Sequence, residues 1–157
     1  MNQIRLFLGS LLGTGLLPYA PGTWASLLTL IPVYLVARSA PETGLFLFII
    51  LASLASLLTS DAAVDKWGQD PPEFVMDEAA GQAIPFLFIT FSGNMQQDFL
   101  LLFGGFVFFR FFDILKPLGI DRLQKLPGKF GILIDDLIAG IYALVCLNLV
   151  IFLTNLF

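Results

Sequence analysis

Apolar residues gather into five segments along the chain, separated by polar connections. A helix that spans a bilayer needs about 20 residues, and only the last segment reaches that length. Two shorter segments contain a proline, Pro32 or Pro85, so we expect them to be tilted or partly buried by their neighbours. The pattern predicts an all-α, polytopic membrane protein of about four to five short hydrophobic helices. The segments cover approximately residues 24–37, 44–59, 79–91, 99–112 and 137–156.

The composition favours a lipid environment over a water-soluble core. Hydrophobic residues make up 57% of the chain and charged residues 13%, whereas about a quarter of a soluble domain is charged. The chain has 157 residues and shows neither internal repeats nor a linker, which predicts one membrane-embedded domain over residues 1–157. It contains no histidine, and its single cysteine, Cys146, lies in the last apolar segment. A histidine base, a phosphohistidine intermediate and a His-ligated zinc site are therefore excluded.

The charges divide unevenly between the two ends of the predicted helices. If the segments cross in alternation, every cation except Arg38 lies on the side that holds the N-terminus and residues 60–78 and 110–136. By the positive-inside rule, this side is cytoplasmic. All acids except Glu42 and Asp98 share it. We therefore expect a polar site at the cytoplasmic face.

Two pairs of adjacent carboxylates precede apolar segments: Asp77 and Glu78 before the third, and Asp135 and Asp136 before the last. The helix dipole favours acids at a helix N-terminus, which is the structural alternative to a functional site. Adjacent side chains on a helix point about 100° apart, so the members of a pair need not face one spot. Gly81, in the turn after the first pair, would permit close approach of another helix.

Residues 109–117, FRFFDILKP, place Arg110, Asp113 and Lys116 three residues apart, roughly on one helix face, before Pro117. Either they form i, i+3 ion pairs at a membrane boundary, or Asp113 is functional. The second alternative has support because a carboxylate in an apolar context usually pairs, binds metal or does chemistry.

Near the N-terminus, Pro21 and Gly22 predict a turn, and Thr23 predicts the N-cap of the helix that follows. The exposed N–H groups of such a helix start can bind an anion, although an ordinary cap would use the same residues.

Oxygen ligands without His or Cys suit a hard cation, and Mg²⁺ is the first choice. Arg and Lys beside it suit a phosphate. The residues alone thus predict a Mg²⁺-dependent enzyme that acts on a phosphate at headgroup level, without indicating which phosphate. The alternative is a small helical membrane transporter or channel with the acidic cluster as a cation path. It predicts ionisable residues at mid-membrane, whereas here they crowd one face.

In the order and spacing of four motifs, nearly the whole chain resembles the phosphatidylglycerophosphatase A family. Each motif alone is weak, but four in order are specific. The matching residues are Pro21-Gly22-Thr23 with Ser26; Asp70-Pro71, Val75, Asp77-Glu78 and Gly81; Arg110, Asp113 and Lys116-Pro117; and Gly131-Ile132, Asp135-Asp136 and Ala139-Gly140. The departures are Ala25 in place of a Gly, Lys129 in place of the second Gly of a pair, and Gly119 near a common Pro.

The resemblance implies a multi-pass protein of the bacterial inner membrane, with its active site facing the cytoplasm. The implied reaction is Mg²⁺-dependent dephosphorylation of phosphatidylglycerophosphate to phosphatidylglycerol plus phosphate, in phospholipid biosynthesis. The partners are then the lipid substrate and the bilayer, without nucleic acid, and protein partners are left open.

The same resemblance implies roles for the site residues. Five acids would hold the metal and carry catalysis, with a water molecule or an Asp as the nucleophile: Asp77, Glu78, Asp113, Asp135 and Asp136. The phosphate or substrate would be bound by Arg110, Lys116, Thr23, Ser26 and Lys129.

Overall fold

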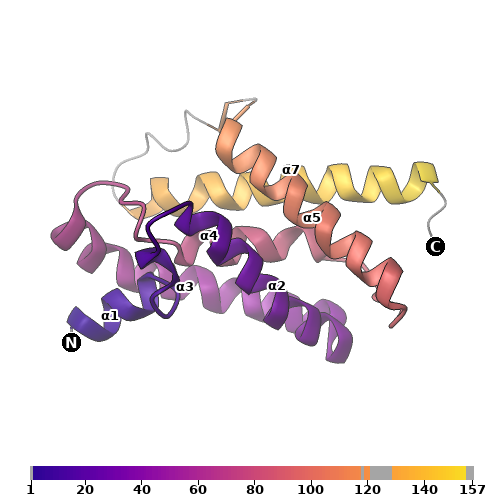
Figure 1. Cartoon of the computed structure of the whole chain (residues 1–157), viewed down its shortest axis with the longest axis horizontal. Helices are drawn as coiled ribbons and strands as arrows, with labels where there is room; N and C mark the ends of the chain where they lie inside the picture. The colour runs from indigo at the N-terminus through magenta and orange to yellow at the C-terminus, as the bar shows by residue number, and fades with distance from the viewer. Residues whose placement is uncertain (1, 118, 121–128, 155–157) are drawn as a thin grey trace.

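The computed structural model describes residues 2–117, 119–120 and 129–154, except for the side chain of Lys129, and every regular element in these ranges is helical (Figure 1). This confirms the predicted all-α class. The elements are α1 (Asn2–Gly9), the 3-10 turn η1 (Thr14–Leu16), α2 (Pro21–Ser39), α3 (Pro41–Trp67), α4 (Met76–Ala83), the 3-10 turn η2 (Ile84–Phe86), α5 (Met95–Leu115) and α7 (Lys129–Thr154).

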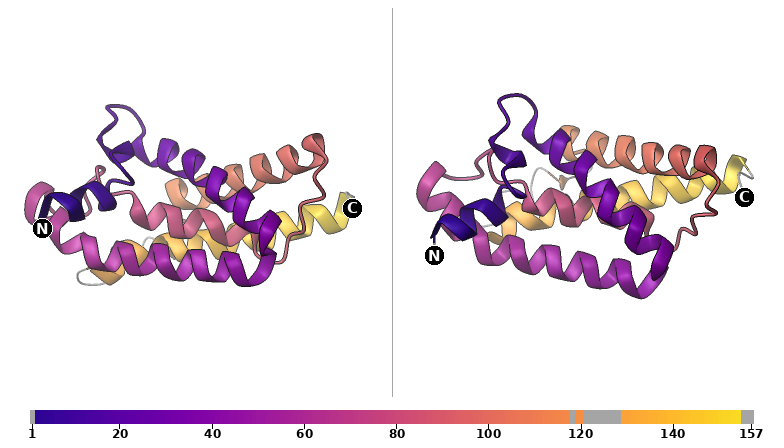
Figure 2. Two further views of the ribbon diagram at one scale, coloured as in Figure 1. Left: turned by 90° about the horizontal axis from the view of Figure 1, so that it is seen from below. Right: turned by 60° about the horizontal axis from the view of Figure 1, so that its bottom comes forward.

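The long helices run lengthwise through an elongated body (Figures 1 and 2). α2 and α3 are consecutive and pack together, and α5 packs across α7. The short α4 lies among them and contacts α2, α3, α5 and α7. The starts of α2, α4 and α7 and the end of α5 consequently meet at one end of the body.

On α3, the outward side chains are larger and more apolar than the inward ones. Between residues 46 and 58, every exposed position is Leu, Ile or Phe. The buried positions of the helix are mostly Ala, Ser and Thr, as at Ala52, Ser56 and Thr59. Helices in lipid pack through small residues in this way, because lipid tails already solvate the large apolar ones.

α3 and residues 130–154 of α7 are each long and apolar enough to cross a membrane. Only 28% and 22% of their most apolar windows are buried, whereas a core helix of a soluble protein is mostly buried. The prediction that only the last apolar segment reaches spanning length is wrong. α3 continues past residue 59 to Trp67, because Ala63 and its neighbours pack against Phe74, Met76 and Ala79.

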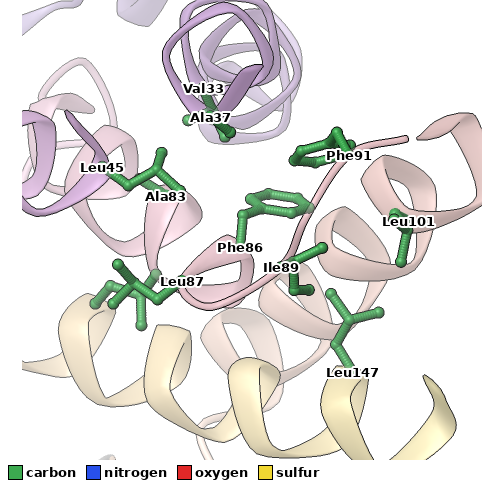
Figure 3. Close-up of a cluster of buried hydrophobic side chains, with 11 residues drawn as sticks. Val33, Ala37, Leu45, Ala83, Phe86, Leu87, Ile89, Phe91, Leu101 and Leu147 are labelled. Carbon is green, nitrogen blue, oxygen red and sulfur yellow. The ribbon is translucent and has the colours of Figure 1, made fainter. Parts of the chain in front are cut away.

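The third predicted segment, residues 79–91, is also not one helix. α4 gives way at Ile84 to η2, because Pro85 lacks the N–H that a continuing α-helix would use. Beyond η2, the chain reaches α5 without regular structure. Phe86 is fully buried in the main apolar core, among residues of α2, α3, α5 and α7 (Figure 3).

The opposite end of the body has its own buried polar cluster. Asp98, 2% exposed, accepts hydrogen bonds from the backbone N–H groups of Ser92 and Gly93, both at 3.0 Å, and from the Tyr34 hydroxyl at 2.8 Å. Arg38 donates to the carbonyl of Phe91 at 3.4 Å. These contacts fasten the start of α5 to the end of α2, and they account for Asp98 and Arg38, two of the three charges expected away from the site.

Gly81 and Gly140 allow α4 and α7 to touch through their backbones. A Cβ on Gly81 would lie 2.6 Å from the carbonyl oxygen of Asp136 and 2.7 Å from the Phe109 ring. A Cβ on Gly140 would lie 2.5 Å from the carbonyl oxygen of Gly81. The predicted close approach at Gly81 is confirmed.

We expect Gly81→Ala to lower the free energy of unfolding by about 1–3 kcal/mol, because the added methyl group meets backbone that cannot move aside. Thermal unfolding of the purified protein in detergent measures the effect. Gly104→Ala is the matched control, since its Cβ would meet only the end of the Leu147 side chain, at 3.1 Å. Equal melting temperatures for the two variants would contradict the backbone contact.

Candidate active site

A cavity of about 370 Å³ opens where the helix ends meet. All five acids predicted for catalysis and metal binding line it, together with Arg110, Lys116 and Thr23. Its walls come from the start of α2, the segment before α4, the start of α4, the end of α5 and the first turns of α7. The structure therefore brings together predicted site residues that lie up to 113 positions apart, between Thr23 and Asp136.

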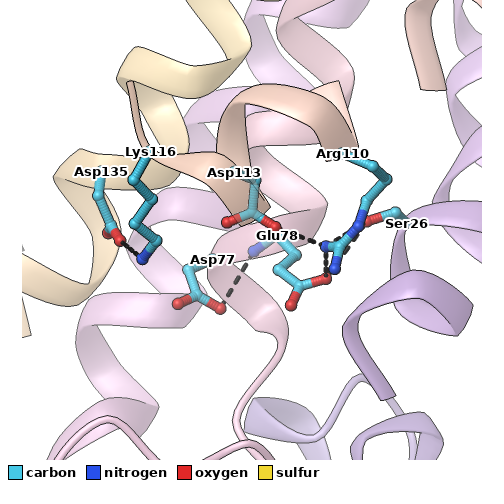
Figure 4. Close-up of polar contacts among 7 residues, drawn as sticks. All are labelled: Ser26, Asp77, Glu78, Arg110, Asp113, Lys116 and Asp135. Atoms are coloured by element: carbon cyan, nitrogen blue, oxygen red, sulfur yellow. Dashed lines mark hydrogen bonds and ion pairs between the residues drawn. The ribbon is translucent and has the colours of Figure 1, made fainter. Parts of the chain in front are cut away.

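Arg110 joins three helices in this cavity (Figure 4). Its Nη1 lies 2.9 Å from Oε2 of Glu78 on α4 and 2.7 Å from Oδ2 of Asp113, one turn along α5. The same nitrogen donates to the Ser26 hydroxyl of α2 at 3.4 Å, and that hydroxyl donates to Glu78 at 3.2 Å. The predicted i, i+3 pair of Arg110 and Asp113 is confirmed.

Lys116 leaves the stripe that Arg110 and Asp113 share. α5 ends at Leu115, and Lys116 adopts a left-handed conformation with φ 44°. Because Pro117 disfavours a helical conformation in the residue before it, the lysine cannot simply continue the helix. Its ammonium group instead binds Asp135 of α7. Burial lowers the pKa of Lys116, but the hydrogen bond to Asp135 and the charge of that carboxylate outweigh burial. The pKa of Lys116 is therefore raised overall.

The side chains of Asp77 and Glu78 point in different directions, as expected for neighbours on a helix. Glu78 turns to Arg110, and burial raises its pKa to about 7 against the opposing charge of Arg110. Asp77 is 5% exposed and accepts a hydrogen bond from the Glu78 N–H at 3.0 Å. Burial, and then the charge of Glu78, raise the pKa of Asp77 well above its usual range.

Asp136 is 4% exposed, and no described residue donates a hydrogen bond to its carboxylate. The neighbouring Asp135 has one oxygen, Oδ1, that is buried without a partner. Among the described residues, six acidic and two basic side chains line the cavity. Three of the acids, Asp77, Asp135 and Asp136, are buried, and such an excess of buried carboxylates favours a further cation.

The acidic side chains of the cavity have the chemistry of a Mg²⁺ site, since the ligands that they offer are carboxylate oxygens. No three Asp, Glu, Cys or His side chains of the described residues yet converge on one point at metal-binding distances. Asp77, Asp136 and the unpaired Oδ1 of Asp135 fit the ion best, because none of them forms an ion pair with a described cation, whereas Glu78 and Asp113 both contact Arg110.

The start of α2 differs from the prediction. Thr23 does not cap the helix: α2 begins at Pro21 and its N-cap is Ala20, so Thr23 lies within the first turn, where it lines the cavity. Proline is favoured at the first helical position, which explains the earlier start. Ser26 is fully buried behind Glu78. The side chain of Lys129 lies outside the described part of the chain, so its predicted phosphate contact stays a prediction.

Two residues of the site were named in the motifs but were given no role at the site. Asp70 lines the cavity from the segment before α4, with φ 46°. Gly22 lies so close to Glu78 that a Cβ would stand 1.9 Å from Oε1. Both belong to the motifs that carry the family resemblance, which was the available signal.

Comparison with known proteins places the chain in a family. The profile described as phosphatidylglycerophosphatase A matches residues 7–151. The chain belongs to the phosphatidylglycerophosphatase A family. This confirms the resemblance drawn from the motifs and, with it, the predicted enzyme class of lipid phosphomonoesterase.

Named relatives cover most of the chain. It is 36% identical over 151 residues to a phosphatidylglycerophosphatase A of Haemophilus influenzae, covering 92% of this chain and 86% of the relative. The phosphatidylglycerophosphatase A of Escherichia coli is 32% identical over 131 residues, covering 82% of this chain and 73% of the relative. A Bacteroides thetaiotaomicron protein, provisionally named a phosphatidylinositol-3-phosphatase, is 30% identical over 146 residues and 90% of each chain. No solved structure matches this member of the family.

We expect Gly22→Ala to lower kcat/KM by about a hundredfold, because its methyl group would displace the Glu78 carboxylate and disturb Arg110. Phosphate release from a lipid phosphate measures the loss. Glu78→Asp shortens the displaced side chain, so the double variant should be no slower than Glu78→Asp alone. Losses that multiply in the double variant would show that the two residues act independently.

Proposed function

We propose that this protein is a Mg²⁺-dependent phosphatase that converts phosphatidylglycerophosphate to phosphatidylglycerol and phosphate in the membrane. The observation that carries the proposal is the cavity itself. Arg110 and Lys116 reach into a carboxylate-lined space at one end of a helical body whose outer faces are apolar. The family and the two relatives named for this activity supply the substrate.

The outer faces favour a multi-pass arrangement, with α2, α3, α5 and α7 in the bilayer. Large apolar side chains are exposed on all four helices, such as Leu35 at 62%, Leu58 at 67%, Phe103 at 54% and Val145 at 61%. Lys66, Arg110 and Lys116 belong to the end that holds the cavity, and Arg38 belongs to the other end. The positive-inside rule then orients the cavity toward the cytoplasm of a bacterial inner membrane. Arg122 and Lys125, which also entered this prediction, lie outside the described residues.

Asp77, Asp136 and Oδ1 of Asp135 would hold the Mg²⁺. When bound, the ion would neutralise negative charge that develops on the transferred phosphoryl group. Glu78 and Asp113 position Arg110 in the present geometry, and their predicted role as ligands remains a prediction.

Arg110 and Lys116 would bind the free oxygens of the phosphate, with the Thr23 hydroxyl at the edge of the cavity. Both cations are held in place by carboxylates, so they are oriented before the substrate arrives. A carboxylate of the cavity would take the proton from the attacking water, or an Asp would attack phosphorus directly. The transporter alternative has no support among the relatives, and the acids of the site cluster at one end.

Purified protein in detergent should release phosphate from phosphatidylglycerophosphate in the presence of Mg²⁺ and lose that activity in EDTA. Phosphatidic acid and phosphatidylinositol 3-phosphate are the comparison substrates, the latter because of the Bacteroides relative. Faster turnover of phosphatidylinositol 3-phosphate would replace the proposed substrate. Full activity in EDTA would remove the metal from the mechanism.

Asp136→Asn should lower kcat by about a hundredfold or more at any Mg²⁺ concentration, because an amide binds a hard cation less well than a carboxylate. Binding of Mn²⁺, followed by electron paramagnetic resonance, gives a readout that does not depend on turnover, and the variant should bind it more weakly. Glu42→Gln, at the first turn of α3 and away from the cavity, is the control. Wild-type Mn²⁺ affinity in Asp136→Asn would exclude Asp136 as a ligand.

A further inference from the structure

Two apolar hollows lie beside the start of α2, next to the candidate active site. The first, which we call the upper hollow, lies at the first turn of α2. It has a volume of about 400 Å³ and is bordered by Leu17, Pro18, Tyr19 and Trp24. These residues flank positions 20–23, which line the polar cavity. The upper hollow and the polar cavity thus adjoin the same turn of α2.

The lower hollow, of about 460 Å³, lies further along the same helix. Leu28, Thr29 and Pro32 of α2 border it, together with Phe48 of α3 and Ala79 of α4. Leu11, Leu12 and Thr14, from the segment before α2, complete it. Among the described residues that border it, only the two threonines have polar side chains, so its walls suit a hydrocarbon.

The two hollows share one stripe of α2. Trp24, Leu28 and Pro32 are spaced four residues apart and so lie on one side of the helix. From Thr23, at the polar cavity, to Pro32 the helix rises by about 14 Å, close to half of the roughly 30 Å hydrocarbon core of a bilayer. The stripe therefore spans about the depth of one leaflet.

The segment that borders both hollows is held in a conformation that its residues rarely adopt. Leu11 and Leu12 have φ of 46° and 58°, and Ala20 has φ of 47°. Left-handed conformations are costly for bulky side chains, and such outliers concentrate at ligand-binding positions. Here they shape the arch that leads from α1 into α2 (Figure 2).

We propose that the two hollows form one groove, the α2 groove, which binds an acyl chain of the lipid whose phosphate enters the polar cavity. This inference rests on the proposed function and adds the site that recognises the apolar part of the substrate. A phosphate held near Gly22 and Thr23 leaves its glycerol beside Trp24, so one chain can descend past Leu28 to Pro32.

The substrate's own chain fits this groove better than a loose bilayer lipid. The chain is tethered to the bound phosphate, which gives it a high effective concentration at the mouth of the groove. That mouth carries Tyr19 and Trp24, which are 82% and 50% exposed, and such residues are favoured at the level of lipid headgroups. The groove would thus align a lipid with its phosphate at the site and its tail along α2.

Leu28→Trp tests the groove by filling its lower half. We expect kcat/KM for dioleoyl phosphatidylglycerophosphate to fall about tenfold, and that for the dihexanoyl lipid to change less than about twofold, since its short chains end above the obstruction. Leu35→Trp is the control, because Leu35 is exposed on the same helix and borders neither hollow. It should leave both substrates unaffected.

An equal effect of Leu28→Trp on both substrates, or no effect on either, would overturn the groove. Failure of the proposed function gives a different result, because wild-type protein would then release no phosphate from either chain length.

A second measurement uses wild-type protein and does not depend on how a variant folds. Phosphatidylglycerophosphate with a diazirine in one acyl chain should label residues 11–32 on irradiation, and excess unlabelled substrate should suppress the label. Phosphatidylcholine should not compete. Labelling spread over the outer faces of α3 and α7, without competition by substrate, would show that only bulk lipid occupies the groove.

Discussion

The ion pair between Arg110 and Glu78 is the contact on which the geometry of the site depends. It joins the end of α5 to the start of α4, and Ser26 extends the join to α2. The two side chains are 14% and 16% exposed, so removing Arg110 would leave the largely buried carboxylates of Glu78 and Asp113 without their cationic partner. Gly22 leaves the space that the Glu78 carboxylate occupies. One buried pair thus sets the relative positions of three helices around the cavity.

The remaining acids outnumber the described cations that line the cavity. Lys116 compensates Asp135, whereas Asp77 and Asp136 lie buried on two helices that pack together and form no ion pair with a described cation. A protein that folds around such charges gains little stability from them, since burying an unpaired carboxylate is costly. This arrangement is expected where a bound ion supplies the missing charge during function. The same electrostatics would then draw both the metal and, through it and the two cations, the phosphate.

Contacts within one helix could be predicted from the sequence, whereas contacts between helices that are distant in the sequence could not. Local periodicity correctly gave the Arg110–Asp113 pair, because both residues lie on one uninterrupted helix. It failed at Lys116, whose direction is set by the helix end before Pro117 and by Asp135 on another helix. The order of the motifs correctly predicted that the acids share one site. The contact between Gly22 and Glu78 could not be predicted, because it depends on how α2 packs on α4, and no local sequence pattern contains that information.

The fold and the site share the contacts that hold them together. In lipid, large apolar side chains gain little by turning inward, so helices associate through small residues, close backbone contacts and polar bonds. Here those contacts are Gly81 and Gly140 between α4 and α7, and the Arg110 bonds among α2, α4 and α5. Each also places a carboxylate, because Gly81 touches the backbone of Asp136. Changes at these positions should therefore alter stability and activity together, whereas changes on the outer faces away from the α2 groove should alter neither.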